Sequence, residues 1–233
     1  TDGSAARNWK IIEYDKAKVK LLDELPDGHM GFPGNLKVEI TYKVNKTTID
    51  IFIEASTDKT TLCNFTNHSY FNLDGAKNIA NHNLFVNCDN VLPVDKDGIP
   101  ISKPVSAKEL NLDFKNSRKL SDKGKPTEID HNFCISNIRQ SLRANAIVSA
   151  KNISLELMST EPGLQIYTGK GLDSGNDEGW GKFPYKEFAG IALEPQIWPD
   201  SPNQSGFPSP YLRPHERYKH HTRIKFNKTN NEK

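Results

Sequence analysis

The sequence has no long apolar run and almost no excess of charge of one sign. Its 233 residues include 31 Lys and Arg against 29 Asp and Glu, a formal net charge of +2. A balance this close to zero, without a basic block, gives no electrostatic footprint for nucleic acid. No stretch approaches the roughly 18 consecutive apolar residues of a transmembrane helix. With aromatic residues at 9%, which argues against disorder, we expect a globular protein that binds neither nucleic acid nor membranes.

Cysteines are few and unpaired in their spacing. Cys63, Cys88 and Cys134 are odd in number, lie far apart and form no CxxC pair, so neither a disulfide framework nor a zinc knuckle is expected. The chain opens without the basic and apolar regions of a signal peptide, and in a sequence rich in Asn the Asn-x-Ser/Thr triplets are expected by chance. We predict a reducing, cytoplasmic location.

Alternation of apolar and polar residues is the main structural pattern. Residues 36–44 and 49–55 each place apolar side chains at every second position, which predicts an antiparallel hairpin with one buried face. Residues 153–157 and 218–226 follow the same period, and the second run carries cations on its outer face, as an exposed or edge strand does. No segment sustains a period of 3.6 residues. The fold class we predict is all-β, a large antiparallel sandwich or a barrel.

The chain shows no internal repeat and no boundary between two cores. We therefore expect one domain over residues 1–226 and a polar tail over residues 227–233. Residues 61–65 read as a further strand. Residues 169–181 are dense in Gly, Asp and Ser and read as a second loose stretch.

Glu194 is the first candidate for chemistry. It follows the apolar run of residues 190–193, a predicted buried strand, and Pro195 is expected to end the strand. A carboxylate at the mouth of an apolar strand is partly desolvated, which raises its pKa toward the value that a general base needs. The spacing alone favours a loop glutamate in a surface salt bridge.

His68 and Asp130 are the next candidates. His68 lies among polar and aromatic residues and suits a general acid, although a packed histidine bonded to a backbone carbonyl fits the same pattern. Asp130 precedes His131, but two adjacent residues of a strand point to opposite faces, which argues against a carboxylate–imidazole dyad.

Other residues offer binding rather than catalysis. Gln165 and Tyr167 share one face of a short strand between glycines, where they would either bind a polyol or face solvent. Trp198 could stack on a sugar ring, but the core is favoured. His220 and His221 lie on opposite faces of a strand, and without H-x-H or HExxH spacing no metal site is expected.

Five segments in this order resemble the aldose 1-epimerase (galactose mutarotase) family, and the resemblance spans essentially the whole chain. The segment that resembles the family's central histidine motif is Asn67-His68-Ser69-Tyr70-Phe71-Asn72-Leu73. The supporting segments are Pro26-Asp27-Gly28 with Gly31-Phe32-Pro33-Gly34, Asp130-His131-Asn132-Phe133, Gly163-Leu164-Gln165-Ile166-Tyr167-Thr168-Gly169, and Leu193-Glu194-Pro195-Gln196 continuing to Leu212-Arg213-Pro214. His215 stands where glycine is usual in the family.

The resemblance implies a large antiparallel β-sandwich with a sugar site on its concave face. It implies that Glu194 is the general base and His68 the general acid in opening and reclosing the hexose ring. Asp130 and Gln165 would hold sugar hydroxyls, and Tyr70 would line the pocket. The reaction interconverts α and β anomers of free hexoses such as glucose and galactose, without a metal or an organic cofactor. The partner would be the sugar alone, and the chain a monomer or homodimer.

Family members also carry further N-terminal strands, with an Arg and a second His that reach the sugar. This chain begins after the expected place of that His, so we expect a sandwich that lacks those strands. Two alternatives remain open. A hexose-6-phosphate 1-epimerase would need cations at the pocket rim, for which only Arg213 is suggestive. A non-catalytic sugar-binding domain would keep Asp130 and Gln165 useful and leave His68 and Glu194 dispensable.

Overall fold

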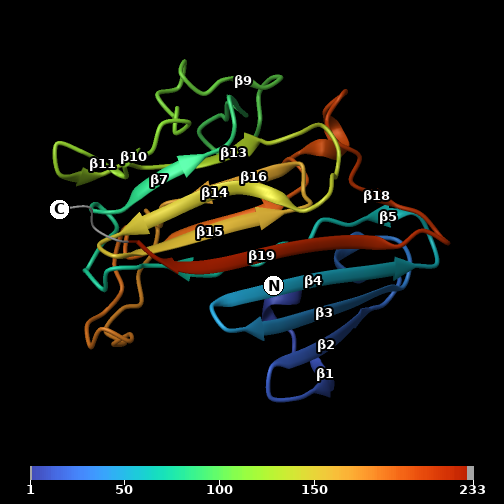
Figure 1. The fold of residues 1–233 in the computed structure, drawn as a ribbon. Coiled ribbons are helices and arrows are strands. Elements are labelled where there is room, and N and C mark those ends of the chain that lie inside the picture. The colour runs from blue at the N-terminus through green and yellow to red at the C-terminus, as the bar shows by residue number, and fades with distance from the viewer. Residues whose placement is uncertain (1, 230–233) are drawn as a thin grey trace.

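Antiparallel sheets account for nearly all of the regular structure (Figure 1). The computed structural model describes residues 2–229. The strands are β1 (Lys10–Tyr14), β2 (Lys18–Leu25), β3 (Leu36–Asn45), β4 (Thr48–Thr57), β5 (Thr61–Leu62), β6 (Tyr70–Phe71), β7 (Asn83–Val86), β8 (Asn90–Val91), β9 (Val105–Ser106), β10 (Arg118–Lys119), β11 (Ser121–Asp122), β12 (Lys125–Pro126), β13 (Asp130–Cys134), β14 (Arg143–Ala150), β15 (Ile153–Ser159), β16 (Gly163–Tyr167), β17 (Ile191–Gln196), β18 (Tyr211–Leu212) and β19 (Tyr218–Lys228). Short 3-10 turns are η1 (Ser4–Ala6), η2 (His29–Gly31) and η3 (Ser201–Asn203). None of the helical segments in the described part of the chain has the length and apolar character needed to cross a bilayer.

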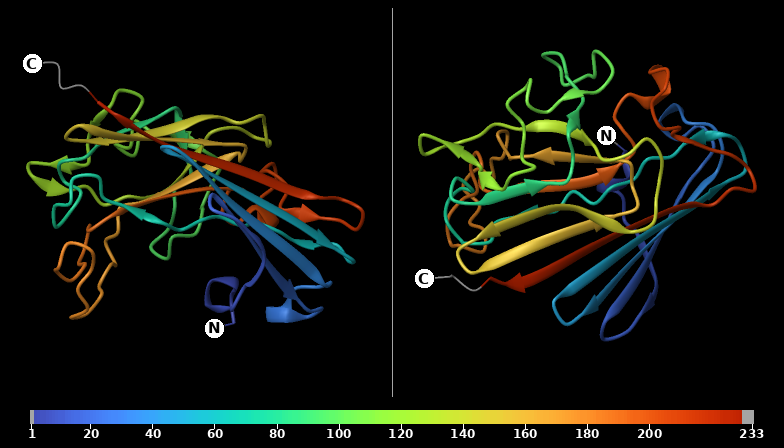
Figure 2. Two further views of the ribbon diagram at one scale, coloured as in Figure 1. Left: turned by 60° about the horizontal axis from the view of Figure 1, so that its bottom comes forward. Right: turned by 45° about the horizontal axis from the view of Figure 1, so that its top comes forward.

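Two large sheets form the sandwich. One has nine strands in the order β1-β2-β3-β4-β19-β15-β14-β7-β10, and the other has six in the order β6-β17-β16-β13-β8-β9. Two further pairs, β11-β12 and β5-β18, stand beside them. Figure 2 shows the six-stranded sheet layered against one part of the nine-stranded sheet. The predicted fold class, an all-β antiparallel sandwich, is therefore confirmed.

The core lies between the facing sheets. β15 contributes Leu155 and Leu157, β16 contributes Leu164 and Ile166, and β13 contributes Phe133, all with 0% exposed surface. Each buried side chain of this size stabilises the fold by about 1.5–3 kcal/mol. The period of two in the sequence arises because alternate residues of each strand face this core.

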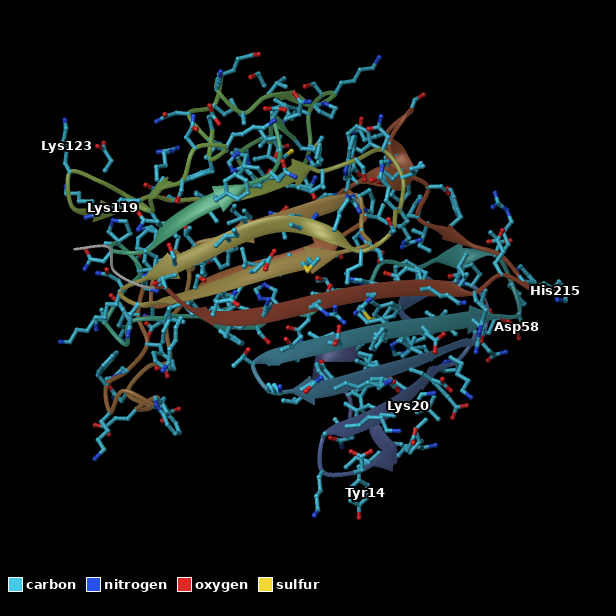
Figure 3. The ribbon with its side chains drawn as sticks, in the orientation of Figure 1. Tyr14, Lys20, Asp58, Lys119, Lys123 and His215 are labelled. Carbon is cyan, nitrogen blue, oxygen red and sulfur yellow. The ribbon has the colours of Figure 1, made fainter. Side chains whose placement is uncertain are left out.

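The nine-stranded sheet extends beyond its partner on the side of β1 to β3 (Figure 2). All five residues of β1 are exposed, and the Tyr14 side chain projects outward from the end of this strand (Figure 3). The predicted hairpin forms as β3 and β4, with Leu36 paired to Thr57 and Asn45 to Thr48. Its apolar face is buried only in part, because Val44 lies in the overhang and is 51% exposed.

The last strand was expected to be exposed or at an edge, and only the first of these is correct. β19 pairs with β4 on one side and β15 on the other, so it lies inside the nine-stranded sheet. The cations of β19 indicate that one face of the strand points to solvent. They do not indicate an unpaired edge, because a strand in the middle of a sheet can also have a solvent-facing side. Asn227 and Lys228, expected in the tail, continue β19 opposite Ser154 and Ile153. Residues 230–233 of that tail lie outside the described residues.

Three local expectations need correction. Pro195 does not end its strand, because β17 runs to Gln196 with Pro195 opposite Leu164. β6 pairs with β17 only as far as Ala192, so at Pro195 one side of the strand needs no N–H donor and tolerates proline. The strand expected over residues 61–65 is only the two residues of β5. The loose stretch of residues 169–181 is held by hydrogen bonds within the segment that joins β16 to β17.

Candidate active site

The candidate residues lie on the face of the six-stranded sheet that points away from the core. Ile191 and Leu193 of β17 face the core and are 0% and 2% exposed. Because side chains alternate along a strand, Ala192 and Glu194 point to the opposite face. The strands that carry the site are thus supported on their other face by the buried core.

Strand register brings residues far apart in sequence into rows on this face. Gln165 lies opposite Glu194 on one side and opposite Asn132 on the other. Tyr70 lies opposite Ala192, and continuing this antiparallel register by two residues places His68 opposite Glu194. The first row therefore reads His68, Glu194, Gln165, Asn132.

A second row runs beside the first. It consists of Tyr70, Ala192, Tyr167 and Asp130, because Tyr167 pairs with both Ala192 and Asp130. Diagonal neighbours in adjacent rows lie within reach of long side chains. The five predicted site residues (His68, Tyr70, Asp130, Gln165 and Glu194) come together in these two rows.

His68 and Glu194 form a carboxylate–imidazole pair in the first row. The His68 Nε2 atom lies 3.4 Å from Glu194 Oε1. Burial of the Glu194 carboxyl raises its pKa above the ordinary glutamate value, while a charge on His68 lowers this pKa and the Asp130 carboxylate raises it. The net upward direction makes Glu194 a stronger base than an exposed glutamate. The prediction that Glu194 is desolvated is confirmed, and it is only 7% exposed.

Local hydrogen bonds fix the segment that carries His68. The Asn67 amide donates from Nδ2 to the Tyr42 hydroxyl on β3 (3.2 Å), and the Ser69 backbone N–H donates to Asn67 Oδ1 (3.2 Å). These bonds leave the His68 side chain half-exposed, with its ring centroid 5.0 Å from that of Tyr70. An imidazole that is accessible on one side and adjacent to a carboxylate on the other can exchange protons with a ligand.

Asp130 and Gln165 form a second polar pair beside the first. Gln165 donates from Nε2 to Asp130 Oδ1 over 2.6 Å. The Oε1 atom of Gln165 and the Oδ1 atom of Asn132 are buried without a hydrogen-bond partner among the described residues. Unpaired buried acceptors of this kind are uncommon in folded proteins and require an explanation. Asn132 was missed by sequence reasoning, although its spacing of two from Asp130 places both on one face.

Tyrosines close the site toward the loop that follows β16. Tyr70 is 40% exposed, and burial together with the neighbouring Tyr167, Glu194 and Asp130 raises its pKa. Its ring centroid lies 6.2 Å from that of Tyr167 in an edge-to-face arrangement. The Tyr167 hydroxyl in turn accepts a hydrogen bond from the Gly171 N–H (2.5 Å), which ties the loop to the sheet.

Other candidates from the sequence lie elsewhere. His131 follows Asp130 on β13 and therefore points to the other face, as expected. Trp198 is 3% exposed and donates to the Pro162 carbonyl (3.1 Å), which confirms its assignment to the core. His220 and His221 do point to opposite sides of β19, where His220 contacts the Phe65 carbonyl and His221 contacts Asp50. Within residues 2–229, no cluster of three or more His, Cys, Asp or Glu side chains is arranged to hold a metal ion.

These features define an antiparallel β-sandwich with a carboxylate–imidazole pair and a carboxylate–amide pair on one open sheet face. The family model for aldose 1-epimerase matches residues 2–225 of this chain. The chain belongs to the aldose 1-epimerase family.

Individual relatives agree with this assignment. An aldose 1-epimerase of Escherichia coli K12 is 34% identical over 97% of this chain and 68% of its own length. Mouse galactose mutarotase is 39% identical over 86% of this chain, which spans 60% of the mouse protein. The crystal structure of a GalM/aldose epimerase homologue from C. elegans is 27% identical with a TM-score of 0.87, covering 96% of this chain and 70% of that one.

Proposed function

We propose that this chain interconverts the α and β anomers of free hexoses such as glucose and galactose, as an aldose 1-epimerase. The observation that carries the proposal is the His68–Glu194 pair, 3.4 Å apart, with the pKa of the buried Glu194 raised. The names of the relatives in mouse and E. coli support the same chemistry. The chain spans about 60% of the length of the mammalian relatives it matches, so the activity of the whole protein is part of the proposal.

The reaction divides between the two groups of the pair. Glu194 accepts the proton of the C1 hydroxyl while protonated His68 donates its proton to the ring oxygen, and the bond between C1 and the ring oxygen breaks. The product is the open-chain aldehyde. Rotation about the C1–C2 bond presents the other face of the carbonyl, and the reverse proton transfers close the ring to the other anomer. Because both reacting oxygens are attached to C1, adjacent acid and base groups can serve them together.

Asp130 and Gln165 are the proposed sugar-binding residues, and Tyr70 lines the site. The Asp130 carboxylate accepts hydrogen bonds from hydroxyls, and the free Oε1 of Gln165 offers another acceptor. A ligand that supplies donors to such buried acceptors removes their desolvation cost. The proposed reaction needs only a proton acceptor and a proton donor, so we propose no metal or organic cofactor for it.

The phosphate-specific alternative has less support. Arg213, the cation that the sequence offered for a phosphate, pairs with Glu216 at 3.6 Å. The charged groups that act on the Glu194 pKa are His68 and Asp130, with no lysine or arginine among them. A non-catalytic sugar-binding domain would bind the same hexoses without turnover.

Polarimetry on freshly dissolved α-D-glucose and α-D-galactose tests the proposal. We expect the chain to accelerate mutarotation above the spontaneous rate, and Glu194→Gln to lower kcat by about 10²–10⁴-fold, the usual contribution of a positioned proton transfer. Glu187→Gln is the matched control, because Glu187 is an exposed carboxylate paired with Lys170. A folded chain that binds galactose, observed by ligand NMR, but never accelerates mutarotation would contradict the proposal and favour a binding domain.

We also propose a cytoplasmic location. It is supported by three free thiols, Cys63, Cys88 and Cys134, which fit a reducing compartment. The monomer or homodimer expected from the family remains a prediction that light scattering can decide.

A further inference from the structure

The segment between β16 and β17 forms an ordered loop beside the candidate site. It appears in orange at the lower left of Figure 1 and projects away from both sheets in Figure 2. Ser174 and Tyr185 join its two arms, since the Ser174 N–H donates to the Tyr185 carbonyl (2.9 Å) and the Tyr185 N–H to Ser174 Oγ (2.9 Å). An Asp173–Lys186 ion pair lies next to this junction. The tip of the loop is therefore held in a defined position.

Trp180 stands at the tip and is 97% exposed. The turn that carries it is built so that its other aromatic side chains fold back. A Cβ at Gly179 would lie 2.1 Å from the Tyr185 ring, and one at Gly181 would lie 2.4 Å from the Phe183 ring. The Tyr185 hydroxyl also accepts a hydrogen bond from the Trp180 backbone N–H (2.8 Å). Two glycines and a tyrosine thus shape a turn that carries Trp180, whose exposed indole is not part of the core.

A cavity of about 380 Å³ lies between this loop and the sheet. Its size falls within the range of small-molecule sites, roughly 300–1,000 Å³. Five of the residues that line it are aromatic, and none of its lining residues carries a charge. The aromatic residues are Tyr70, Phe71, Trp180, Phe183 and Tyr185.

Tyr70 borders both the cavity and the His68–Glu194 pair. It lines the cavity and also lies in the second row of the site, with its ring 5.0 Å from that of His68. A ligand anchored at His68 and Glu194 can therefore continue across Tyr70 toward Trp180. The uncharged, aromatic lining favours the C–H face of a neutral ring and offers nothing to a phosphate. Among the described residues, none accepts a hydrogen bond from the Trp180 indole N–H, which leaves this donor for a hydroxyl.

We propose that this cavity is a second sugar subsite, which binds the non-reducing unit of a disaccharide or oligosaccharide whose reducing-end aldose lies at His68 and Glu194. The inference rests on the proposed function and deepens it, by assigning the residues that contact the second sugar ring. Trp180 acts there as a specificity-determining residue, by packing on the second ring.

The experiment compares mutarotation of glucose, maltose and melibiose by the full chain and its variants. For at least one of the two disaccharides, we expect Trp180→Ala to lower kcat/KM relative to that for glucose by about three- to tenfold, the scale of one aromatic packing contact. The loss should lie in KM, and Trp180→Phe should restore most of it. Tyr14→Ala is the matched control, because Tyr14 is also highly exposed and projects from β1 at a different corner of the molecule (Figure 3).

A binding measurement separates failure of the subsite from failure of the proposed function. Maltotriose is titrated into the Glu194→Gln variant while tryptophan fluorescence is recorded, with the Trp180→Phe version as reference. A fluorescence change that requires Trp180 supports the subsite, even if the parent chain turns over no sugar. Absence of turnover would contradict only the catalytic proposal. Equal effects of Trp180→Ala on glucose and on both disaccharides, or no fluorescence change, would overturn the subsite. Binding of an apolar dye that maltotriose does not displace would also overturn it, in favour of an apolar ligand.

Discussion

An ion pair between Arg139 and the fully buried Glu161 joins two of the connections between the sheets and allows a quantitative test of the fold. Arg139 lies between β13 and β14, and Glu161 lies between β15 and β16, the strand that carries Gln165. The Arg139 Nε atom donates to Glu161 Oε1 over 2.7 Å, and the Glu161 side chain is 0% exposed. The Arg139 guanidinium also lies 4.4 Å from the centre of the Tyr218 ring.

Arg139→Met keeps much of the side-chain stem and leaves the Glu161 carboxylate buried without its cation. Breaking a buried pair in this way costs about 3–5 kcal/mol, because the remaining charge keeps its desolvation penalty. In a chain of this size each kcal/mol shifts Tm by about 2–4 °C, so Tm should fall by about 6–20 °C. Removing both charges in Arg139→Met with Glu161→Met should cost less than Arg139→Met alone.

Equilibrium urea unfolding, followed by circular dichroism, measures these free energies. Arg213→Met serves as the surface control, because the exposed Arg213–Glu216 pair should contribute about 0–1 kcal/mol. The reasoning is refuted if Arg139→Met costs no more than Arg213→Met, or if the double variant loses as much as the two single variants added together.

Four further outcomes follow from the site and from buried residues elsewhere in the fold. Glu194 must be ionised to act as a base, and burial raises its pKa. As pH falls, kcat/KM should therefore begin to decline at a pH above the ordinary glutamate pKa of about 4.3. A decline that begins only at or below that pH contradicts the assignment. Because the pKa of Glu194 is raised in the folded protein, ionisation of Glu194 lowers the free energy of unfolding as pH rises from about 4.3 to the raised value. Urea unfolding should therefore find Glu194→Gln more stable than the parent at pH 8, and this difference should vanish below about pH 4.3. Gly163→Ala would place a Cβ 2.4 Å from Asn132 Oδ1, and we expect a loss of about 1–3 kcal/mol in urea unfolding, whereas a neutral effect would show that the site can relax. Burial raises the pKa of Cys63 to about 12, so iodoacetamide at pH 8 should modify it, by mass spectrometry, only at the rate of unfolding.

The alternating pattern was enough to predict the sandwich, because burial on one face imposes a period of two on each strand. It identified β3, β4, β15 and β19. It could not place β19 inside the sheet, since a cationic face looks the same on a central strand and on an edge strand. His215, which stands where the family usually has glycine, has a left-handed backbone conformation with a φ of 70°.

The site residues were also named from the sequence, but their arrangement was not. Glu194 follows an apolar run, which is a local signal of burial, and the structure bears this out. That His68 lies beside Glu194, and Asp130 beside Gln165, depends on the register of strands separated by up to 126 positions, the interval from 68 to 194. Register of this kind is set by the packing of the whole sheet on its core.

The sequence by itself determined which faces are buried and which residue types are available for acid–base chemistry, because these depend on local pattern and side-chain identity. Only the tertiary structure decided which of those residues meet, that residues 169–181 form an ordered loop, and that Trp180 stands over a cavity continuous with Tyr70. The physical reason is that hydrogen bonding and burial along one strand do not specify its neighbours. Pairing between distant strands is fixed only when both sheets close around a common core.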